Sequence, residues 1–191
     1  MKNIINSLFY SVIFIFLASC SSKKVVHGDM EINAAFNSEY AENMIAYEGQ
    51  LSKNEFRSLK KKFEKELNVE IPNGKTIHIH YSQKAPNCHL MQMDKENFED
   101  VIGNIIRITN NFTSHNDAVN LLIYHKDMFY NDIFERKAEY YLDTGFFYDN
   151  VFTDHKVCQA FMIIKPNGKF YKRHGEHLEG IAIRIIEMKE D

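Results

Sequence analysis

The side chains in this sequence that are best suited to chemistry are those of its three cysteines and nine histidines. Cys88 stands in the stretch YSQKAPNCHLMQM, and the other two cysteines are Cys20 and Cys158. A cysteine acts as a redox nucleophile when its thiol ionises readily, and it is inert when it is buried among apolar groups. The residues around Cys88 leave both interpretations open.

The histidines raise the alternative of a metal site, because imidazole, thiolate and carboxylate are common ligands of zinc and copper. No segment has an established ligand spacing such as HExxH or paired CxxC, and alternating histidines in a strand are more often hydrogen-bonded or exposed to solvent. Metal binding by Cys88, His89 and nearby histidines is therefore the least favoured hypothesis, and the sequence predicts no cofactor. The candidate ligands beside Cys88 are His78, His80, His89, His174, Glu176 and His177.

The elements that must position these side chains begin with a helix. SKNE at Ser52 to Glu55 has the form of a capping box, and large apolar residues follow it at helical spacing. The segment KTIHIHY predicts a strand, and Asp94 predicts the N-cap of a second helix. AVNLLIYH predicts a buried strand, NDIFERKAEYYL an amphipathic helix, and VCQAFMII with KFYKRH a hairpin around KPNG. A final helix is expected around Leu178 to Ile185.

The resulting order, an extra N-terminal helix followed by β-α-β-α-β-β-α, predicts an α/β domain with a mixed sheet and helices on both faces. This order resembles that of the thioredoxin fold. AFMIIKPNGKFYKRHGE looks like the late hairpin of thioredoxin-like proteins, and IHIHYSQKAPNCH falls where that family has its first core strand and active-site loop. The resemblance covers roughly residues 50 to 191, and it implies that Cys88 occupies the active-site position.

The chain departs from the family in the features that support catalysis. Active members carry two cysteines spaced CxxC at the start of a helix, whose N-terminus lowers the pKa of the first thiol. Here the positions of a CxxC partner for Cys88 hold Ala85 and Met91. The family's cis-proline position falls at Gln159 or Ala160. We therefore expect a degenerate thioredoxin-like domain.

In the thioredoxin fold the loop that holds Cys158 packs against the active-site loop, so the resemblance implies that Cys88 and Cys158 are neighbours in space. Three arrangements remain open. The pair can form a structural disulfide or closely apposed thiols, it can be a working redox pair in which Cys88 attacks and Cys158 resolves, or the two thiols can be buried and unpaired.

The N-terminus predicts export. Lys2 precedes the apolar run LFYSVIFIFLA, which is too short to span a bilayer and has the form of a signal peptide. LASC, at Leu17 to Cys20, resembles the lipobox of bacterial lipoproteins. The resemblance implies removal of residues 1–19 and attachment of acyl chains such as palmitate to Cys20, which would anchor the protein to a membrane of the cell envelope.

Residues 20–50 are mostly small and polar, so we expect a lipidated N-terminus and tether, with a short helix between Ala34 and Tyr47. Residues 51–191 form the predicted domain, and the net charge of −3 gives no support for nucleic-acid binding. The predicted function is a membrane-tethered binding module facing the periplasm, with an unknown cell-envelope protein or peptide as partner. The alternative is thiol–disulfide exchange by Cys88 and Cys158.

Overall fold

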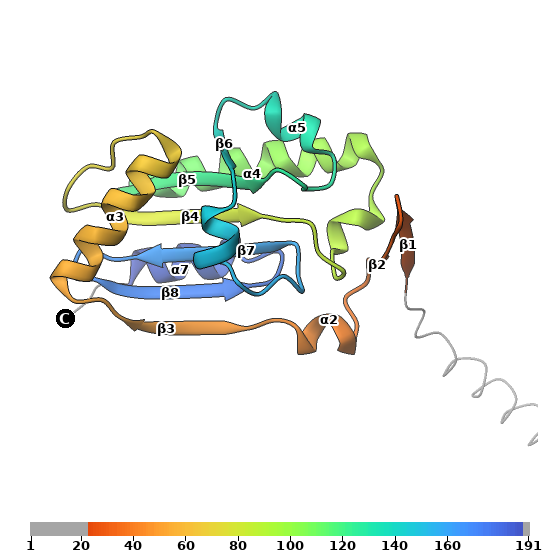
Figure 1. The fold of residues 1–191 in the computed structure, drawn as a ribbon, viewed down its shortest axis with the longest axis horizontal. Coiled ribbons are helices and arrows are strands. Elements are labelled where there is room, and N and C mark those ends of the chain that lie inside the picture. Colours follow the sequence, from red (N-terminus) through yellow and green to blue (C-terminus); the bar gives the residue numbers. More distant parts are fainter. Residues whose placement is uncertain (1–22, 189–191) are drawn as a thin grey trace, which may run out of the picture.

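A computed structural model describes residues 23–188. It is an α/β structure built on a mixed six-stranded sheet in the order β3-β8-β7-β4-β5-β6, with a separate β1–β2 hairpin (Figure 1). The strands are β1 (Lys24–His27), β2 (Met30–Asn33), β3 (Ala46–Gln50), β4 (Thr76–Ser82), β5 (Ala118–His125), β6 (Tyr140–Asp143), β7 (Gln159–Ile164) and β8 (Lys169–His174). The helices are α2 (Ser38–Glu42), α3 (Lys53–Leu67), the 3-10 helix η1 (His89–Gln92), α4 (Lys95–His115), α5 (Asn131–Glu135), α6 (Phe146–Asn150) and α7 (Glu179–Glu187).

The central strands of the sheet, β4 and β7, are buried on both faces, as the predicted α/β class requires. Strand β4 is parallel to β5 and antiparallel to β7, and all seven of its residues are buried. Along β7, Phe161 and Ile163 face a cluster that includes α7, whereas Met162 and Ile164 face a cluster that includes α3 and α6. This alternation follows from the two-residue period of a strand.

The local signals in the sequence correctly predict most of the domain. The capping box at α3 is present, with the Ser52 N–H donating to Glu55 Oε2 at 2.8 Å and the Glu55 N–H donating to Ser52 Oγ at 3.3 Å. Asp94 caps α4 through the Asn97 N–H at 2.9 Å. Gly168 closes the β7–β8 hairpin with a φ of +90°, and a side chain there would collide with the Leu51 carbonyl.

The predicted amphipathic helix over NDIFERKAEYYL is wrong in its second half. Helix α5 ends at Glu135, and the chain then forms β6, an edge strand parallel to β5. Asp143 fixes the end of this strand, because its carboxylate accepts the Tyr81 hydroxyl at 2.8 Å and the N–H groups of Gly145, Phe147 and Tyr148.

The N-terminal segment also differs from its prediction. Where a tether is expected over residues 20–50, the described part contains β1, β2, α2 and β3, and only α2 corresponds to the expected short helix. Strand β3 pairs antiparallel with β8 and so extends the sheet (Figure 1). The physical reason is that β8 would otherwise leave the N–H and C=O groups along its edge unpaired. A polar strand can pair with these groups through its backbone alone.

The predicted signal peptide, residues 1–19, and the predicted lipidation site Cys20 lie outside the described residues. Within residues 23–188, no helix has the length and apolar character needed to cross a membrane.

Candidate functional site

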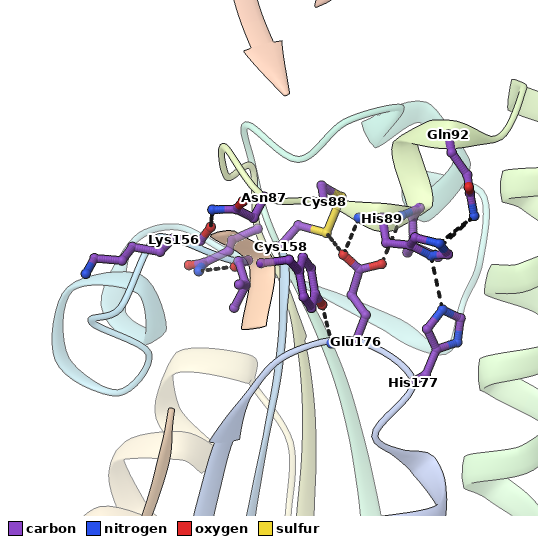
Figure 2. Close-up of a disulfide and its surroundings, with 12 residues drawn as sticks. Asn87, Cys88, His89, Gln92, Lys156, Cys158, Glu176 and His177 are labelled. Atoms are coloured by element: carbon purple, nitrogen blue, oxygen red, sulfur yellow. Dashed lines mark hydrogen bonds between the residues drawn. A yellow bond between two sulfur atoms is a disulfide. The ribbon is translucent and has the colours of Figure 1, made fainter. Parts of the chain in front are cut away.

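The centre of the candidate site is a disulfide between Cys88 and Cys158, with Cα atoms 5.2 Å apart (Figure 2). Cys88 lies between β4 and η1, and Cys158 directly precedes β7. The structure thus brings together the two cysteines that sequence analysis expected to be neighbours. The bond excludes the arrangement with two unpaired thiols, and it is compatible with a structural disulfide and with the oxidised form of a redox pair.

Three chain segments lie side by side around the disulfide. Asn87 forms parallel bridges with Asn33 on one side and Val157 on the other. The Cys88 N–H donates to the Asn33 carbonyl at 3.1 Å, and the Cys158 N–H donates to the Asn87 carbonyl at 3.1 Å. Asn33, from the segment expected to be a tether, is therefore part of the wall of the site.

The disulfide is fully covered. Cys88 and Cys158 have no exposed surface, and they belong to the same buried cluster as Ile32 and Ala34. The Asn33 side chain holds this cover in place, because its amide nitrogen donates to Asn87 Oδ1 at 2.8 Å and to Asn37 Oδ1 at 2.9 Å. A reagent can therefore reach either sulfur only if part of this buried cluster moves.

Glu176 connects the disulfide to the start of η1 (Figure 2). Its carboxyl group accepts the N–H of His89 at 2.6 Å and the N–H of Leu90 at 2.9 Å. The Glu176 oxygen that accepts the His89 N–H, Oε1, also lies 3.1 Å from Cys158 Sγ. The backbone of Glu176 is fixed as well, since its N–H donates to the hydroxyl of the buried Tyr40 at 2.8 Å.

The environment of Glu176 disfavours its charge. Burial raises the pKa of Glu176 to about 8, although the two backbone N–H groups and Tyr40 act in the opposite direction. Burial, together with the charge of Glu176, raises the pKa of Tyr40. Glu176 is thus a buried acid that touches a sulfur, a combination found at sites where protons move and also in purely structural networks.

Two imidazoles stand at the rim of this centre. His89 Nδ1 and His177 Nε2 are 3.4 Å apart, and the Gln92 amide approaches His89 Nε2 at 2.7 Å (Figure 2). The ring of Phe36 packs on His89 with a centroid distance of 4.1 Å. Burial, and then the nearby His177 and Lys23, lower the pKa of His89.

The other histidines considered as metal ligands lie elsewhere. His78 and His80 are buried in β4 and line a small cavity with Gln159 and Glu179, and burial lowers the pKa of each to about 4. His174 is buried at the end of β8, and burial lowers its pKa to about 4. Among the described residues, the groups whose ligand atoms converge are Cys88 with Cys158 and Glu176, and His89 with Glu176 and His177.

The first of these groups offers no thiolate, because both sulfurs are joined in the disulfide. The least favoured hypothesis, a metal site that uses the Cys88 thiolate, would therefore require the disulfide to be reduced, whereas His89 does not take part in the bond. Sequence reasoning missed Asn33 and Tyr40 altogether, although Ile32 and Tyr40 stand out as large apolar residues in a polar run. It identified Glu176 only as a ligand candidate, not as the partner of the disulfide.

Comparison with protein-family models, with curated proteins and with solved structures found no match to this chain.

Proposed function

We propose that the chain is an exported, lipid-anchored bacterial protein whose thioredoxin-like domain acts as a non-catalytic binding module in the cell envelope. The arrangement of the core supports the likeness to thioredoxin. Strands β5-β4-β7-β8 are neighbours in that order, with β4 and β5 parallel and β7 and β8 antiparallel, and α4 and α7 pack together. Cys88 follows the first of these strands in the chain, where thioredoxin-like proteins have their active-site loop.

The observation that carries the non-catalytic part of the proposal is the enclosure of the disulfide beside Glu176. Thiol exchange needs a sulfur that an incoming thiolate can reach, and a leaving thiolate that is stabilised. Both sulfurs are buried. The N–H groups of His89 and Leu90, which could stabilise a thiolate at Cys88, are already bonded to the Glu176 carboxyl group.

An insulin-reduction assay tests this part directly. We expect the chain from Ser21 onward, which contains every described element, to reduce insulin no faster than the buffer with dithiothreitol alone. Cys88→Ser should be equally inert. Reduction by the wild-type protein that is lost in Cys88→Ser would establish thiol exchange instead.

One surface that a partner could use lies around His89, the residue that follows Cys88. We call it the cap face and define it by Phe36, Met44, His89 and His177. Phe36 is 53% exposed and Met44 is 48% exposed, although large apolar side chains are more often buried. Phe36 also contacts both imidazoles, with centroid distances of 4.1 and 5.5 Å. An aromatic ring flanked by polar groups is the kind of anchor that protein and peptide partners use.

A display selection identifies peptides that bind the domain, and affinities of the selected peptides then locate the surface. We expect Phe36→Asp to weaken binding at least tenfold. Leu142→Asp is the matched control, because Leu142 is 47% exposed on β6, which is at the far edge of the sheet from β3. Failure to select any peptide, or equal losses in both variants, would contradict a binding module at the cap face.

The lipid anchor is tested separately. Cys20→Ala should move the protein from the membrane fraction to the soluble fraction and abolish incorporation of labelled palmitate. Retention of the label or of membrane association would rule out lipidation at Cys20.

Thiol–disulfide exchange by Cys88 and Cys158 is the second candidate, and one contact favours it. The Glu176 carboxyl lies 3.1 Å from Cys158 Sγ, where it could exchange a proton with that sulfur when the disulfide opens. In that step a substrate thiolate would attack Cys88 Sγ, form a mixed disulfide and release Cys158 as the leaving group. The insulin assay above distinguishes this candidate from the binding module.

A further inference from the structure

The two imidazoles at the rim of the disulfide are arranged as ligands. We propose that His89 and His177, with Glu176 as a third ligand, bind a divalent transition-metal ion of the zinc and copper class. This site uses neither sulfur and does not depend on the binding function proposed above.

The distance between the two ring nitrogens fits one shared metal ion. His89 Nδ1 and His177 Nε2 are 3.4 Å apart. Two nitrogens bound to one tetrahedral ion at 2.0–2.1 Å lie about 3.3–3.4 Å from each other. The separation of the two nitrogens is therefore already that of two ligands on one ion.

The third ligand lies directly behind the pair. The ligand atoms of His89, Glu176 and His177 are all within 4.8 Å of one another. Glu176 Oε2 accepts the Leu90 N–H and keeps a second lone pair, whereas Oε1 accepts the His89 N–H and also lies against Cys158 Sγ. His177 is exposed, so its ring can move toward the carboxylate. Two imidazoles and one carboxylate form a ligand set that zinc accepts, with the fourth position left for water.

The backbone holds the two imidazoles in place from different parts of the chain. His89 opens η1, and its N–H is bonded to Glu176. His177 lies in the β8–α7 connection with a φ of +55°, in the left-handed region that histidine enters more often than most residues.

A second layer of contacts orients His89. The Gln92 amide nitrogen lies 2.7 Å from His89 Nε2 and 3.3 Å from His89 Nδ1, and Nδ1 is the ring nitrogen that faces His177 Nε2. When a metal occupies His89 Nδ1, the proton of the ring resides on Nε2. A flip of the Gln92 side-chain amide then presents its oxygen, which can accept a hydrogen bond from Nε2–H. Phe36 packs on the ring of His89 and limits its rotation.

Calorimetric titration of the full mature chain, purified with its disulfide intact and freed of metal by a chelator, tests the site with Zn²⁺ and Cu²⁺. We expect one ion per chain with micromolar affinity. His89→Ala and His177→Ala should each weaken binding at least tenfold. His115→Ala is the matched control, because His115 is exposed at the end of α4 and should leave the affinity unchanged.

Electron paramagnetic resonance of the Cu²⁺ form should reveal coupling to two imidazole nitrogens, and His177→Ala should reduce this to one. Absence of stoichiometric binding would mean that the two rings form only a hydrogen bond, which overturns the proposal. Equal affinity in the wild type and in His177→Ala would place any bound metal elsewhere and would overturn it too.

Discussion

At the level of single residues, Glu176 organises the site through its two carboxyl oxygens. It accepts the first two N–H groups of η1, which in a helix have no partner inside the helix. A buried carboxyl group is unfavourable by itself, and the raised pKa of Glu176 reflects this cost. The arrangement is stable because the acid satisfies backbone donors that would otherwise be buried without a partner.

Removal of this carboxyl group should therefore destabilise the fold. We expect Glu176→Ala to lower the free energy of unfolding by about 2–3 kcal/mol, because two buried N–H groups lose their acceptor. Chemical denaturation measures the change. Glu66→Ala, on the exposed surface of α3, is the control and should change stability by less than about 0.5 kcal/mol. A loss at Glu176 no larger than at Glu66 would contradict this account.

The buried histidines of β4 should make stability depend on pH. Burial lowers the pKa of His78 and of His80 from 6.5 to about 4, so the unfolded chain binds more protons than the folded chain between these values. The contribution of each histidine is complete above pH 6.5 and is lost as the pH falls toward 4, with a limit of about 3 kcal/mol per histidine.

His80→Gln isolates one of these contributions, because glutamine does not titrate. Denaturation curves between pH 4 and 7 should have a shallower dependence on pH in this variant than in the wild type. Identical slopes would indicate that His80 takes up its proton without cost in the folded state.

At the level of elements, the N-terminal segment acts as a lid on the disulfide. Residues 32–40 contribute Ile32, the amide network of Asn33 and the buried ring of Tyr40. If this lid excludes reductants, then its loosening should expose the sulfurs before the whole domain unfolds.

Asn33→Ala tests the lid. It removes side-chain hydrogen bonds to Asn37 and Asn87, so we expect the disulfide to be reduced by dithiothreitol at least several-fold faster under native conditions. The readout is alkylation of the released thiols, followed by mass spectrometry. Asn111→Ala, at an exposed position on α4, is the control. Equal reduction rates in the wild type and Asn33→Ala would exclude the amide network as a barrier.

The elements that sequence analysis identified are those with strong local patterns. In β4, β-branched residues alternate with other side chains. Helices α3 and α4 begin with N-cap residues that accept backbone N–H groups, and the β7–β8 hairpin has a glycine in its turn. Strand β6 was missed because its four residues continue an apparent helical pattern, and only its pairing with β5 defines it. Strand β3 was missed because most of its residues are exposed and show no apolar alternation.

The site could be predicted in part for the same reason. The proximity of Cys88 and Cys158 follows from the order of elements, so a resemblance at the level of the fold was enough to expect it. The contacts of Glu176 and Asn33 depend on loop paths that no periodicity encodes. The interpretation of residues 20–50 as a tether also removed Asn33 and Tyr40 from consideration.

At the level of the whole molecule, the disulfide joins the two halves of the sheet across 70 positions in sequence. It connects the β4–α4 unit to the β7–β8 hairpin, while Glu176 joins the connection after β8 to the same point. The bridge between Asn33 and Asn87 is a third long-range link, so the disulfide, the Glu176 contacts and this bridge all meet at one end of the sheet.

Loss of the disulfide should lower the stability of the entire domain. We expect the double variant Cys88→Ala/Cys158→Ala to lose about 4 kcal/mol in the free energy of unfolding. The disulfide closes a long loop and so lowers the entropy of the unfolded chain, and the variant lacks this constraint. Denaturation of the reduced wild-type protein should give a similar loss and serves as the control. A loss below about 1 kcal/mol in both would show that other contacts hold this end together.

The early start of β1 has a consequence for how far the protein extends from a membrane. Strand β1 begins at Lys24, four positions after Cys20, and four residues span at most about 14 Å even when they are fully extended. The β1–β2 hairpin lies at the disulfide end of the sheet (Figure 1), and Lys23 Nζ is 3.4 Å from the Gln92 carbonyl of η1. If Cys20 carries the lipid, the domain rests close to the headgroups with the disulfide end nearest to them. A partner for the cap face would then have to be a membrane-bound protein or one that approaches along the membrane surface.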